Sequence, residues 1–435
     1  MGGCTGGAEH GGGDRNAAGH GGSAPVRELR RLVPGGPDGG LGGLPQPLPV
    51  RAGSSGSGRV RRLARFARAR GRRVTPRVVL AGGGTGGHVY PLLAVAEAAA
   101  GEAVFQFVGG DGLEREVVPQ SGIPFHRVPC GGVVGKGPLV AARNLARIAR
   151  GVLRARRLLR ALRPHAVVST AGYAGYPTAR AAADLGVPLV LVEPNRVPGA
   201  ASRLLAARAR RVCVAFAATA TAFGERAVWT GAPVRRAALP GEAERARVCY
   251  GLAGDRTTVL VLGGSQGSRV LNRVVQEAVT LLGHRTDLQV LHATGRARAG
   301  LGGEVPPGGV LYRTVDYLDP IGDAYAASHL VVARAGAVTC AELLAAGLPS
   351  VLVPLRLASG HQLHNARALE EAGAAVVLHE EALSAVRLAE LLEELLEDRL
   401  RLERMARAAR ALGRPDAARA VWEQVVLAAR EVRRG

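Results

Sequence analysis

Residues 77–96 read RVVLAGGGTGGHVYPLLAVA, and this stretch predicts how the chain folds. A short apolar run, Val78–Leu80, is typical of a buried strand; glycines interrupted by Thr85 follow it, and a helix is expected to open at His88. Glycine tolerates positive φ and close backbone approach, and a helix N-terminus offers unpaired N–H groups with a partial positive charge. The stretch therefore predicts a strand, a glycine turn and a helix whose turn suits a phosphate, a diphosphate or a carbonyl that becomes an oxyanion, with the imidazole of His88 within reach of it.

Length and charge restrict the class of protein. The chain has 435 residues, enough for two or three domains, and its 47% hydrophobic content fits a globular protein. The formal net charge is +22, but Lys136 is the single lysine among the basic residues, which indicates a coding bias towards arginine as much as selection for a partner. No recognition helix, zinc-ligand spacing or aromatic RNA-binding signature accompanies the charge. We therefore expect an anionic membrane surface or an anionic substrate as partner, and no nucleic acid.

Cysteine usage and hydropathy give further expectations. The five cysteines are scattered and none forms a CxxC pair, so neither a disulfide framework nor a zinc site is predicted, and a reducing cytosol is expected. No apolar run reaches the roughly 18 residues needed to span a bilayer. The N-terminus lacks the apolar core of a signal peptide.

Residues 1–73 differ in composition from the rest of the chain. Their Gly-rich stretches cannot bury a core, so this leader is expected to be disordered. Its last part, residues 59–73 (RVRRLARFARARGRR), has two interpretations: a dispensable leader, or a short basic helix that touches a membrane.

From residue 77 to about 234, expected strands and helices alternate. The strands are short Val/Leu-rich runs of the buried parallel kind: Val78–Leu80, Val104–Val108, Phe125–Val128, Ala166–Ser169, Leu189–Val192 and Arg211–Val214. The helices are expected between them: His88–Ala100, Leu113–Gln120, Leu139–Leu162, Tyr176–Leu185 and Ala200–Ala207. This alternation predicts a doubly wound α/β domain.

The same plan repeats from Thr258–Leu262, which is followed by GGSQG at residues 263–267 and a helix from Ser268. Further strands are expected at Gln289–His292, Val310–Tyr312, Leu330–Ala333, Ser350–Val353 and Ala375–Leu378, before a helical tail from Ser384 towards Val432. We expect two Rossmann-like halves, residues 74–236 and 237–435, whose carboxyl strand ends face a shared cleft. Nucleotide-sugar glycosyltransferases and some epimerases share this arrangement.

Several polar residues follow the expected strands. Ser265 and Arg235 are candidates for a diphosphate; a plain tight turn and a solvated arginine are the alternatives. Glu342, in ARAGAVTCAE, is placed to accept ribose hydroxyls, or is an ordinary helix-surface carboxylate. Gln362 and Asn365 share one helical face, and amides suit sugar hydroxyls because they both donate and accept.

Metal binding is not expected. His361 and His364 are three residues apart, but no third ligand is evident near them and no DxD motif is present to hold a metal–diphosphate.

Residues 139–162 (LVAARNLARIARGVLRARRLLRAL) predict an amphipathic helix with interleaved leucines and arginines. Two interpretations remain open: a core-facing helix with a solvated basic back, or a helix beside an anionic membrane. The preceding loop, residues 131–138 with Val133 and Val134, is apolar enough to dip into such a membrane.

Seven blocks, in this order, resemble the MurG family of bacterial N-acetylglucosaminyltransferases: GGGTGGHVYPLLAVA, CGGVVGKG, AGYAGYP, GAPVR, VLGGSQGSRVLN, RAGAVTCAELLAAGLPSVLVP and HQLHNA. The resemblance extends from Val78 to about Ala428. It implies a GT-B fold and transfer of N-acetylglucosamine from UDP-GlcNAc, with inversion, to the 4-hydroxyl of undecaprenyl-diphosphate-linked N-acetylmuramoyl-pentapeptide. That step converts lipid I to lipid II in peptidoglycan synthesis and so serves cell shape and division. It further implies a peripheral enzyme on the cytoplasmic side of the cell membrane, without cofactor or metal.

The resemblance also implies roles for individual residues. On the donor, Ser265 and Arg235 would meet the diphosphate, and the backbone of Leu318 would contact the uracil. Glu342 would bind the ribose, and Gln362 would contact the sugar hydroxyls. The turn before Glu342 would line the ribose and phosphate with Ala337, Val338, Thr339, Cys340 and Ala341. From the first half, four residues would close over the donor: Thr85, Gly86, Gly87 and Asn195. The acceptor would lie near Gly83, Gly84 and Tyr173.

Two departures from the family pattern stand out. The family usually reads HEQN where this chain has Val192, Glu193, Pro194 and Asn195, so local acceptor contacts differ. GNPVR is GAPVR here, a smaller change.

Inversion needs a base that takes the acceptor proton as UDP leaves from the opposite face. We expect His88 as this base, with Glu193 as the second candidate; the alternative role of His88 is to position the acceptor diphosphate. Rival classes remain at this point: a nicotinamide-dependent oxidoreductase, a non-catalytic membrane or nucleic-acid adaptor, a glycolipid glycosyltransferase and a nucleotide-sugar epimerase. Against the oxidoreductase, no acidic residue ends the second strand; Asp111 follows two glycines beyond it.

Overall fold

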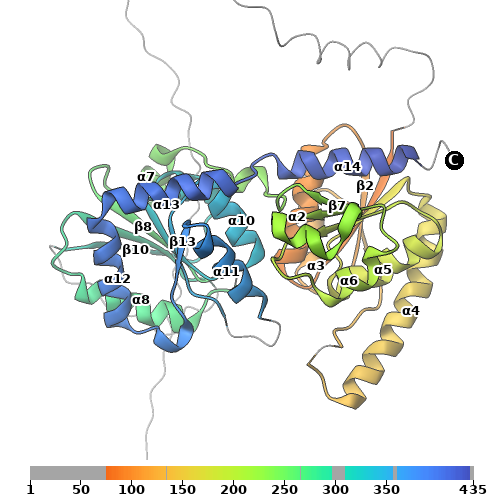
Figure 1. Cartoon of the computed structure of the whole chain (residues 1–435), viewed down its shortest axis with the longest axis horizontal. Helices are drawn as coiled ribbons and strands as arrows, with labels where there is room; N and C mark the ends of the chain where they lie inside the picture. Colours follow the sequence, from red (N-terminus) through yellow and green to blue (C-terminus); the bar gives the residue numbers. More distant parts are fainter. Residues whose placement is uncertain (1–74, 134, 265, 296–308, 356–359, 432–435) are drawn as a thin grey trace, which may run out of the picture. The chain divides into compact units, whose positions relative to one another are not determined.

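The structure, a computed structural model, describes residues 75–133, 135–264, 266–295, 309–355 and 360–431. The expectations for the leader 1–73, for Ser265 and for Val134 therefore fall on residues outside the described part. Within it, the chain forms two parallel sheets with helices on both faces (Figure 1), as the doubly wound prediction required.

The first sheet has the strand order β3-β2-β1-β4-β5-β6-β7 among the described residues, and each neighbouring pair is parallel. Its strands are β1 (Arg77–Ala81), β2 (Val104–Gly109), β3 (Phe125–Arg127), β4 (Ala166–Ser169), β5 (Leu189–Glu193), β6 (Arg211–Val214) and β7 (Ala227–Trp229). The helices are α2 (Gly86–Ala98), α3 (Glu114–Gln120), α4 (Pro138–Leu162), α5 (Gly172–Asp184) and α6 (Ala200–Ala206). Short 3-10 turns follow: η2 (Ala217–Ala222), η3 (Gly224–Arg226) and η4 (Arg236–Ala238).

The second described sheet has the order β10-β9-β8-β11-β12-β13 and is also parallel. Its strands are β8 (Thr257–Leu262), β9 (Leu288–Ala293), β10 (Leu311–Val315), β11 (Leu330–Ala333), β12 (Ser350–Leu352) and β13 (Ala375–Val377). The helices are α7 (Ala243–Tyr250), α8 (Arg269–Leu281), α9 (Ile321–Ala326), α10 (Ala337–Ala346), α11 (His361–Glu371), α12 (Ala385–Glu397), α13 (Arg399–Leu412) and α14 (Ala417–Glu431), with the turn η5 (Glu380–Ala382).

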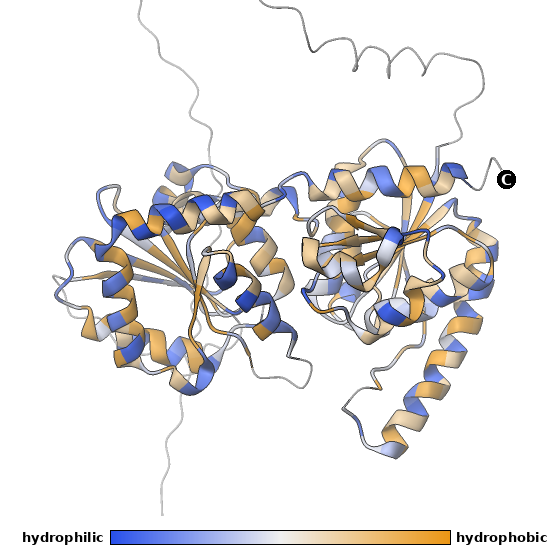
Figure 2. Cartoon of the chain, in the orientation of Figure 1, coloured by the Kyte–Doolittle hydropathy of each residue, from blue (hydrophilic) through white to orange (hydrophobic). Residues whose placement is uncertain are grey.

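Both sheets reverse their strand order beside their first strand, between β1 and β4 and between β8 and β11. Ligands of open α/β sheets bind beyond the carboxyl strand ends at such switch points. Nearly all strand residues next to these points are buried, and Figure 2 shows the strands as predominantly hydrophobic. The short apolar runs in the sequence thus specified strands buried on both faces.

The expected strands are all present, most with ends within one residue of those expected. The prediction missed β7 and α7, and it expected one helical tail where the structure has α12, α13 and α14.

The last helix, α14, packs against the first sheet although it follows the second half in sequence. Val421, Trp422 and Val425 share a core cluster with Val78 and Leu80 of β1. The Trp422 indole donates to Glu102 Oε2 at 2.8 Å, and its ring meets Phe105 edge-on at 5.8 Å between centroids. The core of the first half therefore includes side chains from the C-terminal end of the described chain.

Candidate functional site

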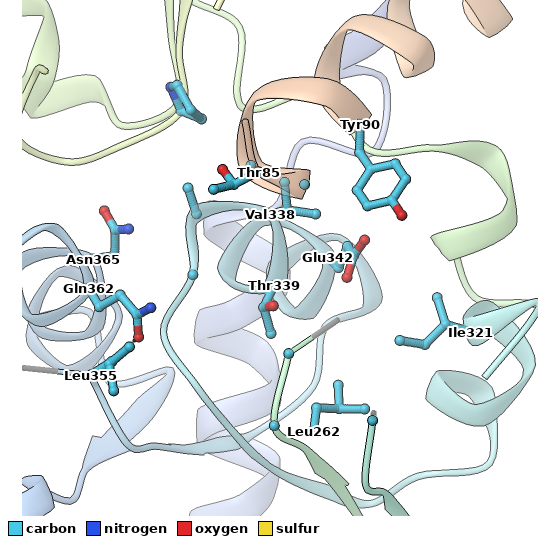
Figure 3. A pocket seen from close by; sticks show the side chains of 18 of the residues that line it. Thr85, Tyr90, Leu262, Ile321, Val338, Thr339, Glu342, Leu355, Gln362 and Asn365 are labelled. Carbon is cyan, nitrogen blue, oxygen red and sulfur yellow. Dashed lines mark hydrogen bonds between the residues drawn. The ribbon is translucent and has the colours of Figure 1, made fainter. Parts of the chain in front are cut away.

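A cavity of about 500 Å³ lies between the carboxyl strand ends of the two halves. The first half contributes the start of α2 and the loop after β5; the second contributes the turns after β8, β10 and β11 and the start of α11 (Figure 3). Its lining includes Thr85, Gly86, Gly87, His88, Asn195, Gly263, Gly264, Leu318, Ala337, Val338, Thr339, Glu342, Gln362 and Asn365. The two glycine turns recognised in the sequence thus reach one shared site, of the size that holds a nucleotide-sized ligand.

The start of α10 forms one wall of this cavity. Gly336 is the N-cap residue and supplies no side-chain cap, so N–H groups of the first turn of α10 remain without an intrahelical partner. Val338, Thr339 and Glu342 of this helix are drawn around the cavity in Figure 3. A helix start of this kind favours an anionic group.

Glu342 lies one turn further along α10. Its Oε2 accepts a hydrogen bond from the Tyr325 hydroxyl at 2.8 Å. Burial raises the pKa of the Glu342 carboxyl to about 7, and the Tyr325 bond and the nearby Arg235 charge only partly oppose that rise. The site therefore contains a carboxyl group that titrates near neutral pH, which is typical of functional sites.

The start of α11 forms the adjoining wall. Gln362 lines the cavity, and its Oε1 accepts the Leu355 N–H at 3.0 Å, which fixes the amide orientation. His361 also lines the cavity, and its Nδ1 is buried without a hydrogen-bond partner among the described residues.

His88 faces the cavity from the first half. Its Nδ1 is likewise buried without a partner in the described structure. Burial lowers the pKa of His88, while the carboxylate of Glu193 acts in the opposite direction and His361 adds to the lowering. The ring is therefore neutral at neutral pH, the form that can accept a proton.

Glu193 does not line this cavity and is 2% exposed. Its Oε1 accepts the Asn195 backbone N–H at 3.0 Å and the Asn195 side-chain amide at 3.1 Å, and its Oε2 accepts the Gly199 N–H at 3.0 Å. Both carboxylate oxygens thus hold the loop after β5.

Neither diphosphate candidate, Ser265 or Arg235, is found in the lining of the cavity among the described residues. Ser265 lies outside the described residues. Arg235 is absent from the lining; its Nε donates to Glu97 Oε1 at 2.8 Å, and its guanidinium lies 5.8 Å from the ring centre of Tyr90, which does line the cavity. Arg235 therefore stands at the margin of the site.

The three acceptor candidates also lie outside the cavity lining. Gly83 is buried, and Gly84 is partly buried beneath the phenol of Tyr173, which is itself 42% exposed. Of the α10 candidates, Cys340 faces the core instead, and Ala341 lines a separate small hollow.

Some lining residues were not singled out from the sequence: Tyr90, Asp316, Tyr317, Ile321 and Tyr325. Tyr90 lies two residues after His88, and Tyr317 directly precedes Leu318, so both lie close in sequence to residues that had been predicted. Their side chains reach the site because the segments after β1 and after β10, one from each half, converge there.

Comparisons with known proteins agree with this geometry. The glycosyltransferase family 28 N-terminal domain matches residues 78–214, and the C-terminal domain of that family matches residues 258–421. The chain is 36% identical to the UDP-N-acetylglucosamine–N-acetylmuramyl-(pentapeptide) pyrophosphoryl-undecaprenol N-acetylglucosamine transferase of Halothermothrix orenii, over 78% of this chain and 95% of that protein. It is 40% identical to the Moorella thermoacetica protein of the same name, over 81% of this chain and 98% of that protein.

Solved structures also show similarity to a glycosyltransferase of this kind. The crystal structure of Acinetobacter baumannii MurG matches with a TM-score of 0.64 and 27% identity, over 80% of this chain and 99% of that chain. A UDP-GlcNAc 2-epimerase from Neisseria meningitidis, 13% identical with a TM-score of 0.56, shares the fold alone. Two glycosyltransferase domains around one cleft, and extensive identity to full-length relatives, lead to one conclusion: the chain belongs to the MurG family of N-acetylglucosaminyltransferases, with the GT-B fold.

Proposed function

We propose that the chain transfers N-acetylglucosamine from UDP-GlcNAc to undecaprenyl-diphosphate-linked N-acetylmuramoyl-pentapeptide, the lipid I to lipid II step of peptidoglycan synthesis. The observation that carries the proposal is a cavity lined by the starts of both α2 and α10, one from each half. A group-transfer enzyme needs donor and acceptor in one water-poor space, and a cleft between two nucleotide-type sheets provides it.

In this proposal residues 237–435 bind the donor and residues 74–236 receive the acceptor. The uncapped N-terminus of α10 meets the diphosphate, with Arg235 close enough to the site to act on Glu342. Glu342 accepts the ribose hydroxyls, the Leu318 backbone meets uracil, and Gln362 reads the sugar. Thr85, Gly86, Gly87 and Asn195 close over the donor from the first half.

The reaction is one in-line displacement. The acceptor hydroxyl oxygen forms a bond to the anomeric carbon while the bond from that carbon to the UDP oxygen breaks, and His88 takes the hydroxyl proton. The negative charge that develops on UDP is stabilised by the N–H groups at the start of α10 and by Arg235. Glu193 acts through its loop, because its carboxylate oxygens accept N–H groups of Asn195 and Gly199.

A membrane-facing surface is proposed on α4. Leu139, Leu145 and Leu153 are 86%, 62% and 54% exposed, and arginines alternate with them on a helix without acidic residues. Figure 2 shows both kinds of residue along this helix. Among the described helices none is long and apolar enough to cross a bilayer. Exposed leucines with arginines suit an anionic lipid surface, and this supports the proposal of a peripheral protein at the cytoplasmic side of the cell membrane.

Product analysis tests the proposed reaction. Purified protein is incubated with UDP-GlcNAc, with and without the lipid-linked acceptor, and the products are separated and identified. We expect UDP and a lipid-linked β-disaccharide only when the acceptor is present. Conversion of UDP-GlcNAc to an epimer without acceptor, or no UDP release with it, would contradict the proposal.

A further inference from the structure

The glycine turn after β1 is packed against protein on the side away from the cavity. At Gly83 the backbone has a φ of +144°, and a Cβ there would overlap the carboxyl group of Glu114. A Cβ at Gly84 would collide with the Tyr173 ring. Neither glycine lines the cavity. The most conspicuous glycines of the sequence are thus required by neighbouring side chains of this chain.

Glu114, the first residue of α3, is fully buried. Its Oε2 accepts the Gly84 N–H at 2.6 Å, and its Oε1 accepts the N–H groups of Gly110 at 2.8 Å and Gly112 at 3.2 Å. No Arg or Lys of the described chain lies within ion-pair distance of this carboxylate. Its charge is therefore compensated by backbone dipoles, as in the binding of an external anion to a glycine-rich turn.

These hydrogen bonds join two turns that leave adjacent strands. Gly84 follows β1, whereas Gly110 and Gly112 follow β2. The joined turns set the direction in which α2 begins, and α2 begins two residues after Gly84. Thr85, Gly86 and His88, which line the cavity, are consequently oriented by a carboxylate that does not reach it.

The same carboxylate changes what the turn can bind. The Gly84 N–H is already used, and a buried negative charge stands directly behind the turn. Both facts disfavour a phosphate at this point, because like charges repel strongly where water is excluded. The negative charge of a bound nucleotide is then directed to the uncapped start of α10.

We propose that Glu114 is a positioning residue of the transferase site: it holds the 82–85 turn so that α2 presents His88 to the acceptor, with Thr85 and Gly86 beside the donor. The kinetic part of this proposal rests on the proposed function; the structural part does not.

The test compares E114Q with E116Q, which removes a carboxylate from the exposed face of the same helix. Gln keeps the size of Glu but places an amide NH2 where an oxygen accepted a backbone N–H. Amide hydrogen exchange of a peptide covering residues 82–88 is measured, together with kcat, both KM values and Tm. We expect faster exchange and a kcat reduced at least about 10-fold in E114Q, because small misplacements of positioned groups are costly. The UDP-GlcNAc KM should stay within about two-fold, since most donor contacts come from the second half, and E116Q should match wild type.

Unchanged exchange and unchanged kcat in E114Q would overturn the proposal. The proposal would also be overturned if E114Q lowered Tm, and lowered kcat and raised the UDP-GlcNAc KM by similar factors. That pattern would indicate a general destabilisation of the fold, not a displaced turn. If E114Q does not fold, E114D serves instead: it keeps the charge but shortens the reach, and the same two outcomes decide. If wild-type protein has no transferase activity, the proposed function fails while the exchange comparison still decides whether Glu114 holds the turn.

Discussion

The side chains of Asn365 and Asn195 join the two halves of the protein by an amide–amide hydrogen bond, Nδ2 of Asn365 to Oδ1 of Asn195, at 3.2 Å. Asn365 is 1% exposed, and its Oδ1 also accepts the Arg196 N–H at 2.9 Å. Its Nδ2 is 3.4 Å from the carbonyl of Ala335, at the turn that precedes α10. One buried amide therefore connects the proposed donor turn with the loop after β5.

Replacing Asn365 with Ala should uncouple these two segments. The change leaves the Arg196 N–H without its acceptor, and an unpaired buried polar group costs about 1–3 kcal/mol. We expect kcat to fall about 10-fold or more because donor and acceptor groups lose their register. Steady-state kinetics on both substrates measure this, with H364A, at an exposed position on the same helix, as the control. Wild-type kcat in N365A would show that the link has no role in turnover.

His88→Ala should remove the proposed base. General base catalysis contributes roughly 10²–10⁴-fold, so kcat should fall by that factor while UDP-GlcNAc affinity stays near wild type. Turnover is measured with the lipid acceptor, and affinity separately by calorimetric titration. H284A, at an exposed histidine paired with Glu393, is the control. Unchanged turnover would exclude His88 from the chemistry.

Activity should depend on the ionisation of Glu342. Its pKa is raised to about 7, so the carboxylate form that accepts ribose hydroxyls is lost as the pH falls through that value. We expect kcat/KM for UDP-GlcNAc to decline on the acid side with an apparent pKa near 7. Y325F removes a hydrogen bond that favours the ionised form, so the decline should move to higher pH. If the decline of kcat/KM on the acid side persists unchanged in E342Q, the ionisation of another group causes that decline.

The same raised pKa has a consequence for stability. Between the ordinary value of 4.5 and about 7 the folded protein holds more protons on Glu342 than the unfolded chain. This group's contribution to stability is therefore present below pH 4.5 and lost as the pH rises through about 7.

Trp422 should be important for the stability of the first half. It is 2% exposed and joins α14 to the core around β1. Trp422→Ala should lower the free energy of unfolding by about 3–5 kcal/mol, because a large buried ring is replaced by a cavity. Chemical denaturation measures the loss. L427A, on the exposed side of the same helix, should cost less than about 0.5 kcal/mol. Equal effects of the two changes would show that α14 is not held through Trp422.

The exposed leucines of α4 should determine membrane binding. The triple variant L139S/L145S/L153S removes apolar area that would enter the interface, and it should bind vesicles containing phosphatidylglycerol much more weakly. Vesicle co-sedimentation measures this, with phosphatidylcholine vesicles as the test of charge. A matched triple, L204S/V248S/L400S, removes exposed apolar side chains elsewhere on the described surface. If both triples bind alike, α4 is not the contact surface.

The sequence by itself determined the two parallel sheets and most positions of their strands. Short Val/Leu-rich runs such as Val78–Leu80, each followed by glycine or a polar turn, are typical of strands buried on both faces. It also determined the cavity-lining segments that follow a strand directly, including His88 and Glu342, because carboxyl ends of parallel strands meet at one edge.

Only the tertiary structure decided which polar groups face the cavity and which hold its walls. Glu193 and Glu114 are both carboxylates beside the site, yet each is occupied by backbone N–H groups, from Asn195 and Gly199 in one case and from Gly84, Gly110 and Gly112 in the other. Asn365 and Asn195 are 170 residues apart, and α14 returns to the first sheet. Local spacing specifies elements, but such pairings depend on side-chain directions across separate elements, which no local pattern encodes.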